Sequence, residues 1–124
     1  MLGEFVCNPP YFGADISEVN GVRLPQSYLD FMKEQNGGEG DIGETWFVLF
    51  RLEELKELND AYGFTESLPG CVIIGSNGAD EFYGINAAGQ YFNVPALFDE
   101  DDITVLCDDF SQLANAVNAF WKSL

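Results

Sequence analysis

Apolar residues recur at helical spacing in three segments of the chain. The first segment covers residues 25–35 and places three large side chains on one side of a helix: Tyr28, Phe31 and Met32. Pro25 suits the first helical position, because no backbone N–H is needed there. The Asn-Gly-Gly sequence that follows, at residues 36–38, tolerates the left-handed backbone of a helix C-cap. The pattern therefore predicts a short helix with a signal at each end.

The other two helical segments lie in the middle and at the end of the chain. Between Leu52 and Tyr62, apolar residues recur every three or four positions with glutamates between them, which predicts an amphipathic helix ended by Gly63. In the last segment, Asp108 or Asp109 is placed to cap a helix. That helix has one apolar stripe, formed by Phe110, Leu113, Ala114, Val117, Phe120 and Trp121.

Short apolar runs bounded by turn residues predict strands between these helices. Residues 46–50 form a nearly continuous apolar run that suits a buried strand, and residues 39–44 before it are interpreted as a loop. Three further runs, separated by turns that contain glycine and asparagine, indicate antiparallel hairpins at residues 71–74, 81–85 and 90–94. Residues 103–107 form either an edge strand or a bridging segment. We therefore expect an α+β fold with a curved antiparallel or mixed sheet of about four to six strands, flanked by helices.

The composition fits a single folded domain over residues 1–124, because 47% of the chain is hydrophobic. The formal charge is −16, from 21 acidic and 5 basic residues. Such a surface repels phosphate backbones and anionic lipids, so we expect no binding to nucleic acids or membranes. It attracts a basic protein partner, although the same acidity also serves solubility.

The three cysteines, Cys7, Cys71 and Cys107, are odd in number and include no CxxC pair. Their spacing indicates structural thiols in a reducing compartment instead of a disulfide framework. The first residues lack the basic and apolar regions of a secretory signal, and no apolar run approaches the roughly 20 residues that span a bilayer. We expect a cytoplasmic protein.

Residue types that carry out catalysis are scarce in this chain. It contains no histidine, which removes the commonest general base and most zinc sites. The acidic run at residues 99–102 lacks the spacing of a calcium-binding loop, and residues 75–78 form a hairpin turn without the lysine of a phosphate loop. We predict no catalytic, metal or cofactor site. Paired carboxylates leave a small carboxylate-based hydrolase as a less favoured alternative.

Four motifs follow one another along the chain, beginning with LPxxYxxF…NGG. They lie at residues 24–38, 46–62, 74–86 and 108–113. In type and order they resemble the motifs of the SUKH superfamily, the Smi/Knr-type proteins, and the resemblance covers about residues 23–122. Two features depart from that family. Its helix before the first motif has no clear counterpart in residues 1–22, and its GGGE turn is Gly-Ala-Asp-Glu at residues 78–81.

The resemblance implies a binding protein whose motif residues at 24–38 determine the fold. Bacterial members of the superfamily resemble immunity proteins, which neutralise polymorphic toxins encoded beside them in the manner of toxin–antitoxin pairs. Many such toxins are nuclease-like domains with basic faces. We therefore expect this chain to bind a basic toxin domain without catalysing a reaction. The alternative is a regulatory adaptor similar to the cell-wall branch of the superfamily.

The residues expected to bind the partner are carboxylates and one aromatic: Asp80, Glu81, Tyr83, Asp99, Glu100, Asp101 and Asp102. The aromatic residues compared for exposure are Trp46, Tyr83, Tyr91 and Phe92. Strand alternation places Tyr83 on the same face as Glu81, with Phe82 on the opposite face. Tyr83 is therefore the aromatic residue expected at the surface, where such residues serve as anchors in protein interfaces.

Overall fold

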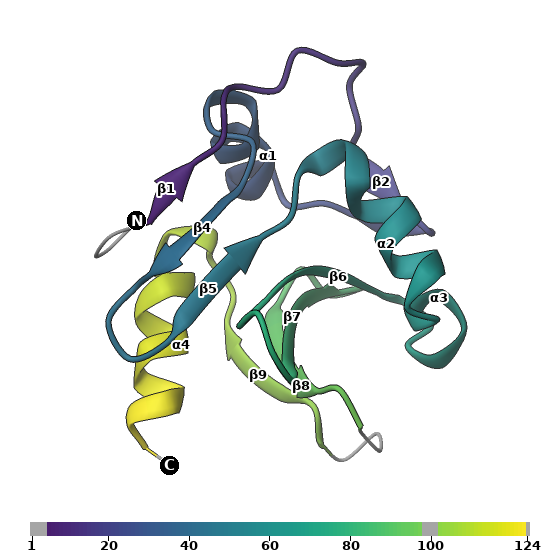
Figure 1. The fold of residues 1–124 in the computed structure, drawn as a ribbon. Coiled ribbons are helices and arrows are strands. Elements are labelled where there is room, and N and C mark those ends of the chain that lie inside the picture. Colours follow the sequence, from purple (N-terminus) through teal and green to yellow (C-terminus); the bar gives the residue numbers. More distant parts are fainter. Residues whose placement is uncertain (1–4, 98–101, 124) are drawn as a thin grey trace.

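The computed structural model describes residues 5–97 and 102–123 (Figure 1). Their main element is a seven-stranded sheet in which every neighbouring pair of strands is antiparallel. In spatial order its strands are β1 (Val6–Cys7), β4 (Gly38–Asp41), β5 (Trp46–Leu49), β6 (Cys71–Ser76), β7 (Glu81–Asn86), β8 (Tyr91–Pro95) and β9 (Thr104–Cys107). The predicted α+β class is confirmed, with more strands in the described part than the sequence indicated.

The helices confirm the three predicted helical segments. They are α1 (Gln26–Glu34), the 3-10 turn η1 (Leu52–Glu54), α2 (Leu55–Ala61), α3 (Phe64–Ser67), the 3-10 turn η3 (Phe110–Gln112) and α4 (Leu113–Lys122). Gly63 has a φ of 78° and separates α2 from α3. Asp109 caps η3, because its carboxylate accepts a hydrogen bond from the Ser111 backbone N–H at 2.9 Å.

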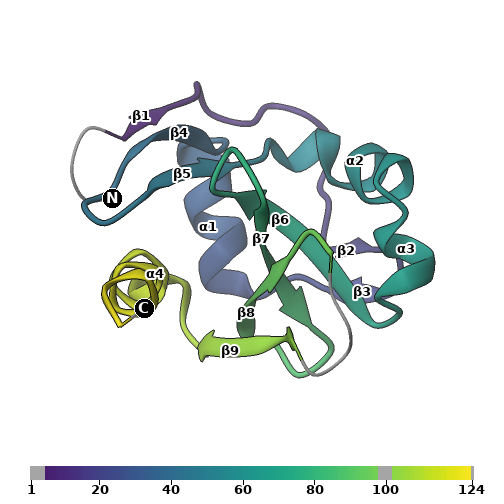
Figure 2. The same cartoon turned by 60° about the horizontal axis from the view of Figure 1, so that its bottom comes forward.

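The helices cover the two faces of the sheet unequally. On one face, α1 and α4 bury the inward side chains of β5 and β7, among them Phe47, Leu49 and Ile85. On the other face, α2 and α3 cover β6, β7 and β8 through a second cluster that contains Phe64 and Phe92. Figure 2 shows α1 and α4 on one side of β4 and β5, while α2 and α3 lie away from these two strands. One face of β4 and β5 is therefore left without a helix over it.

The sequence prediction was wrong at residues 36–41. The C-cap of α1 is Gln35 in an extended conformation, and Gly38 already begins β4. Gly37 has a φ of 80°, and a Cβ there would lie 2.3 Å from the Leu49 carbonyl oxygen. The two glycines therefore allow the chain to turn tightly from α1 into the sheet, so residues 39–41 of the expected loop belong to a strand, while residues 42–44 form the hairpin loop.

Residues 5–22 contain strands and no helix. β1 pairs with β4 at the sheet edge, and a small hairpin joins β2 (Glu18–Val19) to β3 (Val22–Arg23). The helix that family members carry before the LP motif is thus replaced here by extended chain within the described residues. Between β4 and β5, the Asn118 side chain of α4 donates to the Ile42 carbonyl at 2.7 Å and accepts from the Glu44 N–H at 3.0 Å. These two bonds fix the β4–β5 hairpin against α4.

Candidate partner-binding surface

The structure brings three of the predicted binding residues to one end of the sheet. β7 begins at Glu81, opposite Pro95 at the end of β8, and the Asp80 carbonyl accepts the Ala96 N–H at 2.8 Å. Asp102 precedes β9 at this same end, and both aspartates are exposed. Three other predicted residues, Asp99, Glu100 and Asp101, lie outside the described residues.

Glu81 is half-buried and has one amide partner. The Asn93 Nδ2 group donates to its carboxylate at 3.1 Å, while the Oδ1 atom of the buried Asn93 side chain has no hydrogen-bond partner. Burial raises the pKa of Glu81, and the neighbouring Asp80 carboxylate raises it further. Glu81 therefore binds its proton more tightly than a free glutamate does, although the hydrogen bond from Asn93 opposes this shift of the pKa.

The expected exposure of Tyr83 is wrong. Its side chain has no exposed surface, its ring stacks on Phe47 at a centroid distance of 5.1 Å, and its hydroxyl accepts the Trp121 Nε1–H at 2.9 Å. Burial raises the pKa of this hydroxyl to about 12, so it stays protonated at neutral pH. Alternation does place Tyr83 and Glu81 on one face of the sheet. At Tyr83, however, α4 covers that face through Trp121. Tyr83 belongs to the core.

Trp46 is the exposed member of the four aromatic residues that the sequence singled out. Its side chain is 49% exposed, whereas Tyr91 and Phe92 are buried together with Tyr83. The indole lies against the β6–β7 hairpin, because a Cβ on Gly78 would be 3.2 Å from its Cδ1 atom. Trp46 therefore stands beside the turn that carries Asp80.

The uncovered side of β1, β4 and β5 forms a surface that we call the open face, defined by Val6, Glu39, Asp41, Trp46 and Val48. Register places these residues together, because Glu39 pairs with both Val6 and Val48, and Asp41 pairs with Trp46. The alternate residues Phe47 and Leu49 point the other way, into the core. The open face thus combines partly exposed apolar side chains with two exposed carboxylates.

A groove of about 270 Å³ continues the open face toward η1. It is lined by Asn8, Gly38, Glu39, Val48, Leu49, Phe50, Arg51 and Glu54. Its one cation, Arg51, is balanced by Glu54, with 3.8 Å between the guanidinium Nε and the carboxylate. The groove is shallow and mixed in character, which suits contact with another protein more than enclosure of a small molecule.

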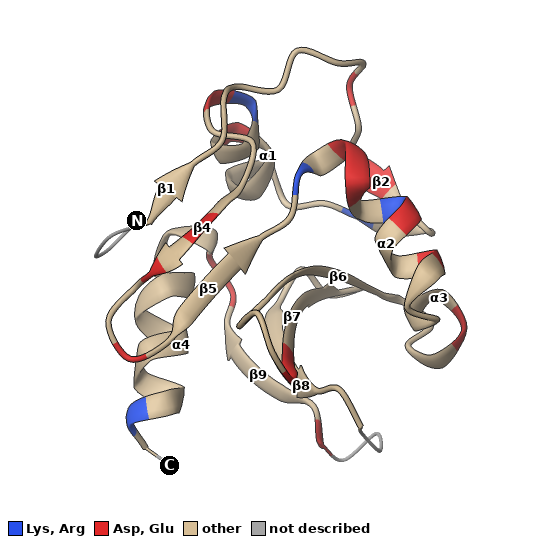
Figure 3. Cartoon of the chain, in the orientation of Figure 1, with Lys and Arg blue, Asp and Glu red and all other residues tan. Residues whose placement is uncertain are grey.

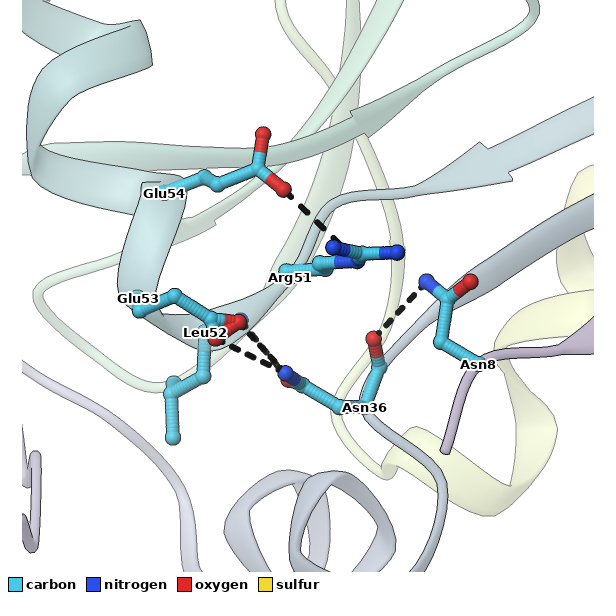
Figure 4. Close-up of polar contacts among 6 residues, drawn as sticks. All are labelled: Asn8, Asn36, Arg51, Leu52, Glu53 and Glu54. Atoms are coloured by element: carbon cyan, nitrogen blue, oxygen red, sulfur yellow. Dashed lines mark hydrogen bonds and ion pairs between the residues drawn. The ribbon is translucent and has the colours of Figure 1, made fainter. Parts of the chain in front are cut away.

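Asn36 holds this end of the molecule together (Figure 4). Its Oδ1 accepts the Leu52 N–H at 2.8 Å, which satisfies a free backbone donor at the start of η1, and its Nδ2 donates to Glu53 at 2.6 Å. The Asn36 carbonyl accepts the Asn8 Nδ2 group at 3.0 Å. Asn36, a buried residue of the first motif, therefore joins the N-terminal segment to the second motif. This gives the asparagine of the NGG sequence a structural role.

Acidic residues lie in β4, which contributes to the open face, and along the helices η1, α2 and α3 (Figure 3). We call the surface on these helices the helical ridge, formed by Glu53, Glu54, Glu57, Asp60 and Glu66. Two of the five basic residues lie on or beside this ridge and pair with its carboxylates: Arg51 with Glu54, and Lys56 with Asp60 at 2.8 Å. These pairs are exposed and neutralise little of the negative charge.

All three cysteines are free thiols, and burial raises the pKa of both Cys71 and Cys107, which keeps them protonated and weakly nucleophilic. No group of three or more carboxylate or thiol side chains in residues 5–97 and 102–123 is arranged to hold a metal ion. No helix within these ranges is long and apolar enough to cross a membrane.

Comparison with known proteins yields one family. Residues 14–116 match the model of the SMI1 / KNR4 family (SUKH-1). A search of curated proteins found no match. The family match runs from the segment before β2 to the first turn of α4, and it includes the open face from β4 onward, the helical ridge and all of the groove except Asn8.

Proposed function

Because the chain belongs to the SMI1 / KNR4 family (SUKH-1), we propose that it is a non-enzymatic immunity protein that neutralises a basic bacterial toxin by binding it. The family includes immunity proteins, and its members act as binding domains. The toxin is a nuclease-like domain whose substrate-binding surface is basic, and the immunity protein acts in the cytoplasm, where such a toxin meets its substrate.

One observation carries this proposal: the formal charge is −16, and none of the carboxylate side chains in residues 5–97 and 102–123 is buried. Exposed carboxylates occupy the open face, the helical ridge and the end of the sheet at Asp80 and Asp102. Such a field draws a basic protein from solution and speeds encounter, and it repels nucleic acid that competes for the same toxin surface.

Neutralisation works by occlusion in this proposal. Acidic side chains of the immunity protein pair with the lysines and arginines that a nuclease uses to hold phosphates, so the substrate no longer reaches them. Asp80, Glu81 and Asp102 belong to the contact surface, as do Asp99, Glu100 and Asp101. Tyr83 has a different role, because a buried ring supports the sheet from within.

Growth of bacteria that express the toxin encoded beside this gene tests the proposal. Co-expression of the immunity protein should restore growth, and the two proteins should purify together as one complex. A toxin that kills equally well with and without this chain would contradict the proposal. If the neighbouring genes encode no toxin, and the chain instead purifies with cell-wall or housekeeping proteins of its host, the regulatory adaptor is the correct function.

A further inference from the structure

We propose that the open face of β1, β4 and β5 is the docking surface for a basic protein, with a lysine or arginine side chain of that protein lying over the Trp46 indole. This inference deepens the proposed function and rests on it for the identity of the partner. The choice of face and the chemistry of the contact come from the arrangement of residues in this chain.

The open face has the construction of an unoccupied interface. Helices bury the opposite side of β4 and β5, and α2 and α3 cover only the neighbouring strands on this side (Figures 1 and 2). Three apolar side chains remain in contact with solvent across the three strands: Val6 at 72% exposure, Trp46 at 49%, and Val48 at an intermediate level. An apolar patch of this kind, rimmed by charged residues, is typical of protein-binding surfaces.

Trp46 is the strongest candidate for an anchor on this face. No other aromatic ring in the described residues stacks on the indole, which is 49% exposed and has its Cδ1 atom beside Gly78, so part of the ring is available to a partner. The Asn118 bonds to Ile42 and Glu44 hold the hairpin just before it, so the indole is presented by a fixed backbone. A rigid aromatic side chain gives contact area at a low entropy cost.

The charges around Trp46 select a cationic partner. Asp41 is its cross-strand neighbour, Glu44 precedes it in the hairpin, and Asp80 lies in the adjacent turn. Arg51 lies at the far end of the groove, where Glu54 balances its charge. An indole face flanked by carboxylates favours a guanidinium or ammonium group, which gains a cation–π contact and ion pairs together.

The helical ridge is the rival surface, because it is also acidic and carries the exposed Tyr62. That ring, however, already packs against Phe64 and Phe82 at centroid distances of 6.1 and 5.7 Å, and Lys56 lies on the same ridge. Phe12 is 89% exposed and lies outside the sheet, between β1 and β2, which makes it a suitable control residue. Among these exposed aromatics, Trp46 combines a free ring face with surrounding negative charge.

The test is an NMR titration of the isotopically labelled full chain with a synthetic peptide that alternates arginine with valine. The expected result is a set of saturable chemical-shift changes for the Trp46 indole N–H and for the backbone amides of β4 and β5. A control peptide that carries glutamate in place of arginine should cause no comparable changes. Shifts centred on the helical ridge, or no shifts with the arginine peptide, would overturn the proposal. Because the peptide replaces the toxin, this result is independent of whether a toxin is neutralised.

Two matched pairs of variants complete the test. Trp46→Ala should weaken peptide binding by roughly fivefold, and Phe12→Ala, which removes an exposed ring elsewhere, by less than about twofold. If Trp46→Ala does not fold, the surface carboxylates serve in its place. Glu39→Gln with Asp41→Asn should weaken binding, whereas Glu57→Gln with Glu66→Gln, which removes the same charge from the helical ridge, should have the smaller effect. Equal effects of the two charge pairs would overturn the choice of face.

Discussion

Asn36 shows how much structure one amide can hold. Its side chain uses both ends, accepting from the Leu52 N–H and donating to Glu53, and it is 5% exposed. A buried amide with satisfied partners stabilises the fold, whereas removing it leaves the buried Leu52 N–H without a partner. The NGG part of the first motif is therefore a connection between segments, and the sequence shows only that a turn occurs there.

Replacing Asn36 with alanine should lower the free energy of unfolding by about 2–3 kcal/mol, because the Leu52 N–H loses its partner inside the protein. Urea denaturation of the variant measures this loss. Asn115→Ala is the matched control, since Asn115 is exposed on α4. Its stability should stay within about 0.5 kcal/mol of the wild type. Equal stability of the two variants would show that the Asn36 bonds contribute nothing.

Glu81 predicts a pH dependence of stability. Its pKa is raised in the folded protein, so the folded state binds the proton more tightly than the unfolded state does. The stabilisation from the neutral form is complete below the ordinary glutamate pKa of 4.5 and is lost as pH rises through the raised value. Glu81→Gln should therefore raise the melting temperature more at pH 7.5 than at pH 4. The glutamine side chain also offers an N–H₂ donor to the unpaired Asn93 Oδ1 atom. A gain that is the same at both pH values would contradict this role.

Among the elements, the strands and helices with strong apolar patterns could be predicted from the sequence, and β4 could not. Its Gly-Glu-Gly-Asp sequence has no apolar side chain, and its place in the sheet depends on the close approach of β1 and β5. The prediction that Tyr83 is exposed was wrong for a related reason. Alternation assigns residues to two faces, but which face a helix covers depends on tertiary packing. For the same reason the exposure of Trp46 could not be predicted, because the apolar run at residues 46–50 indicated a strand buried on both faces.

The close packing at the turn into β4 can be tested by comparing two glycines with nearly equal φ angles. Gly37 and Gly63 have φ values of 80° and 78°, but a Cβ would meet the Leu49 carbonyl at 2.3 Å only at Gly37. Gly63→Ala should cost about 1–2 kcal/mol from backbone strain alone. Gly37→Ala should cost more than about 3 kcal/mol or prevent folding, because β4 must also move away from β5. Chemical denaturation compares the two variants, and similar losses would refute the close packing at Gly37.

At the scale of the whole molecule, charge is kept apart from the core. The described residues pack a two-faced α+β core, none of their carboxylates is buried, and many of these lie on the open face, the helical ridge and one end of the sheet. Net charge could be predicted from composition, and a basic partner stays a prediction. The distribution over separate surfaces required the structure, because residues from β1, β4 and β5 meet only in the folded sheet.

Electrostatic steering predicts that association with the toxin depends on salt. Charges separated by more than about 10 Å are screened at 0.1 M salt. The association rate constant should therefore fall by roughly tenfold or more between low and high salt, while the dissociation rate changes much less. Stopped-flow fluorescence of Trp46 offers a direct signal, with Trp46→Phe to separate it from Trp121. An association rate that is indifferent to salt would remove steering from the mechanism.

The most direct test of the proposed function is a titration of toxin activity. The toxin domain encoded beside this gene is mixed with increasing amounts of the purified chain, and the turnover of the toxin's substrate is measured. Immunity by direct binding predicts that activity falls in proportion to the added chain and reaches background near one molar equivalent, with no turnover by the chain itself. Full toxin activity in the presence of a roughly tenfold molar excess would contradict it.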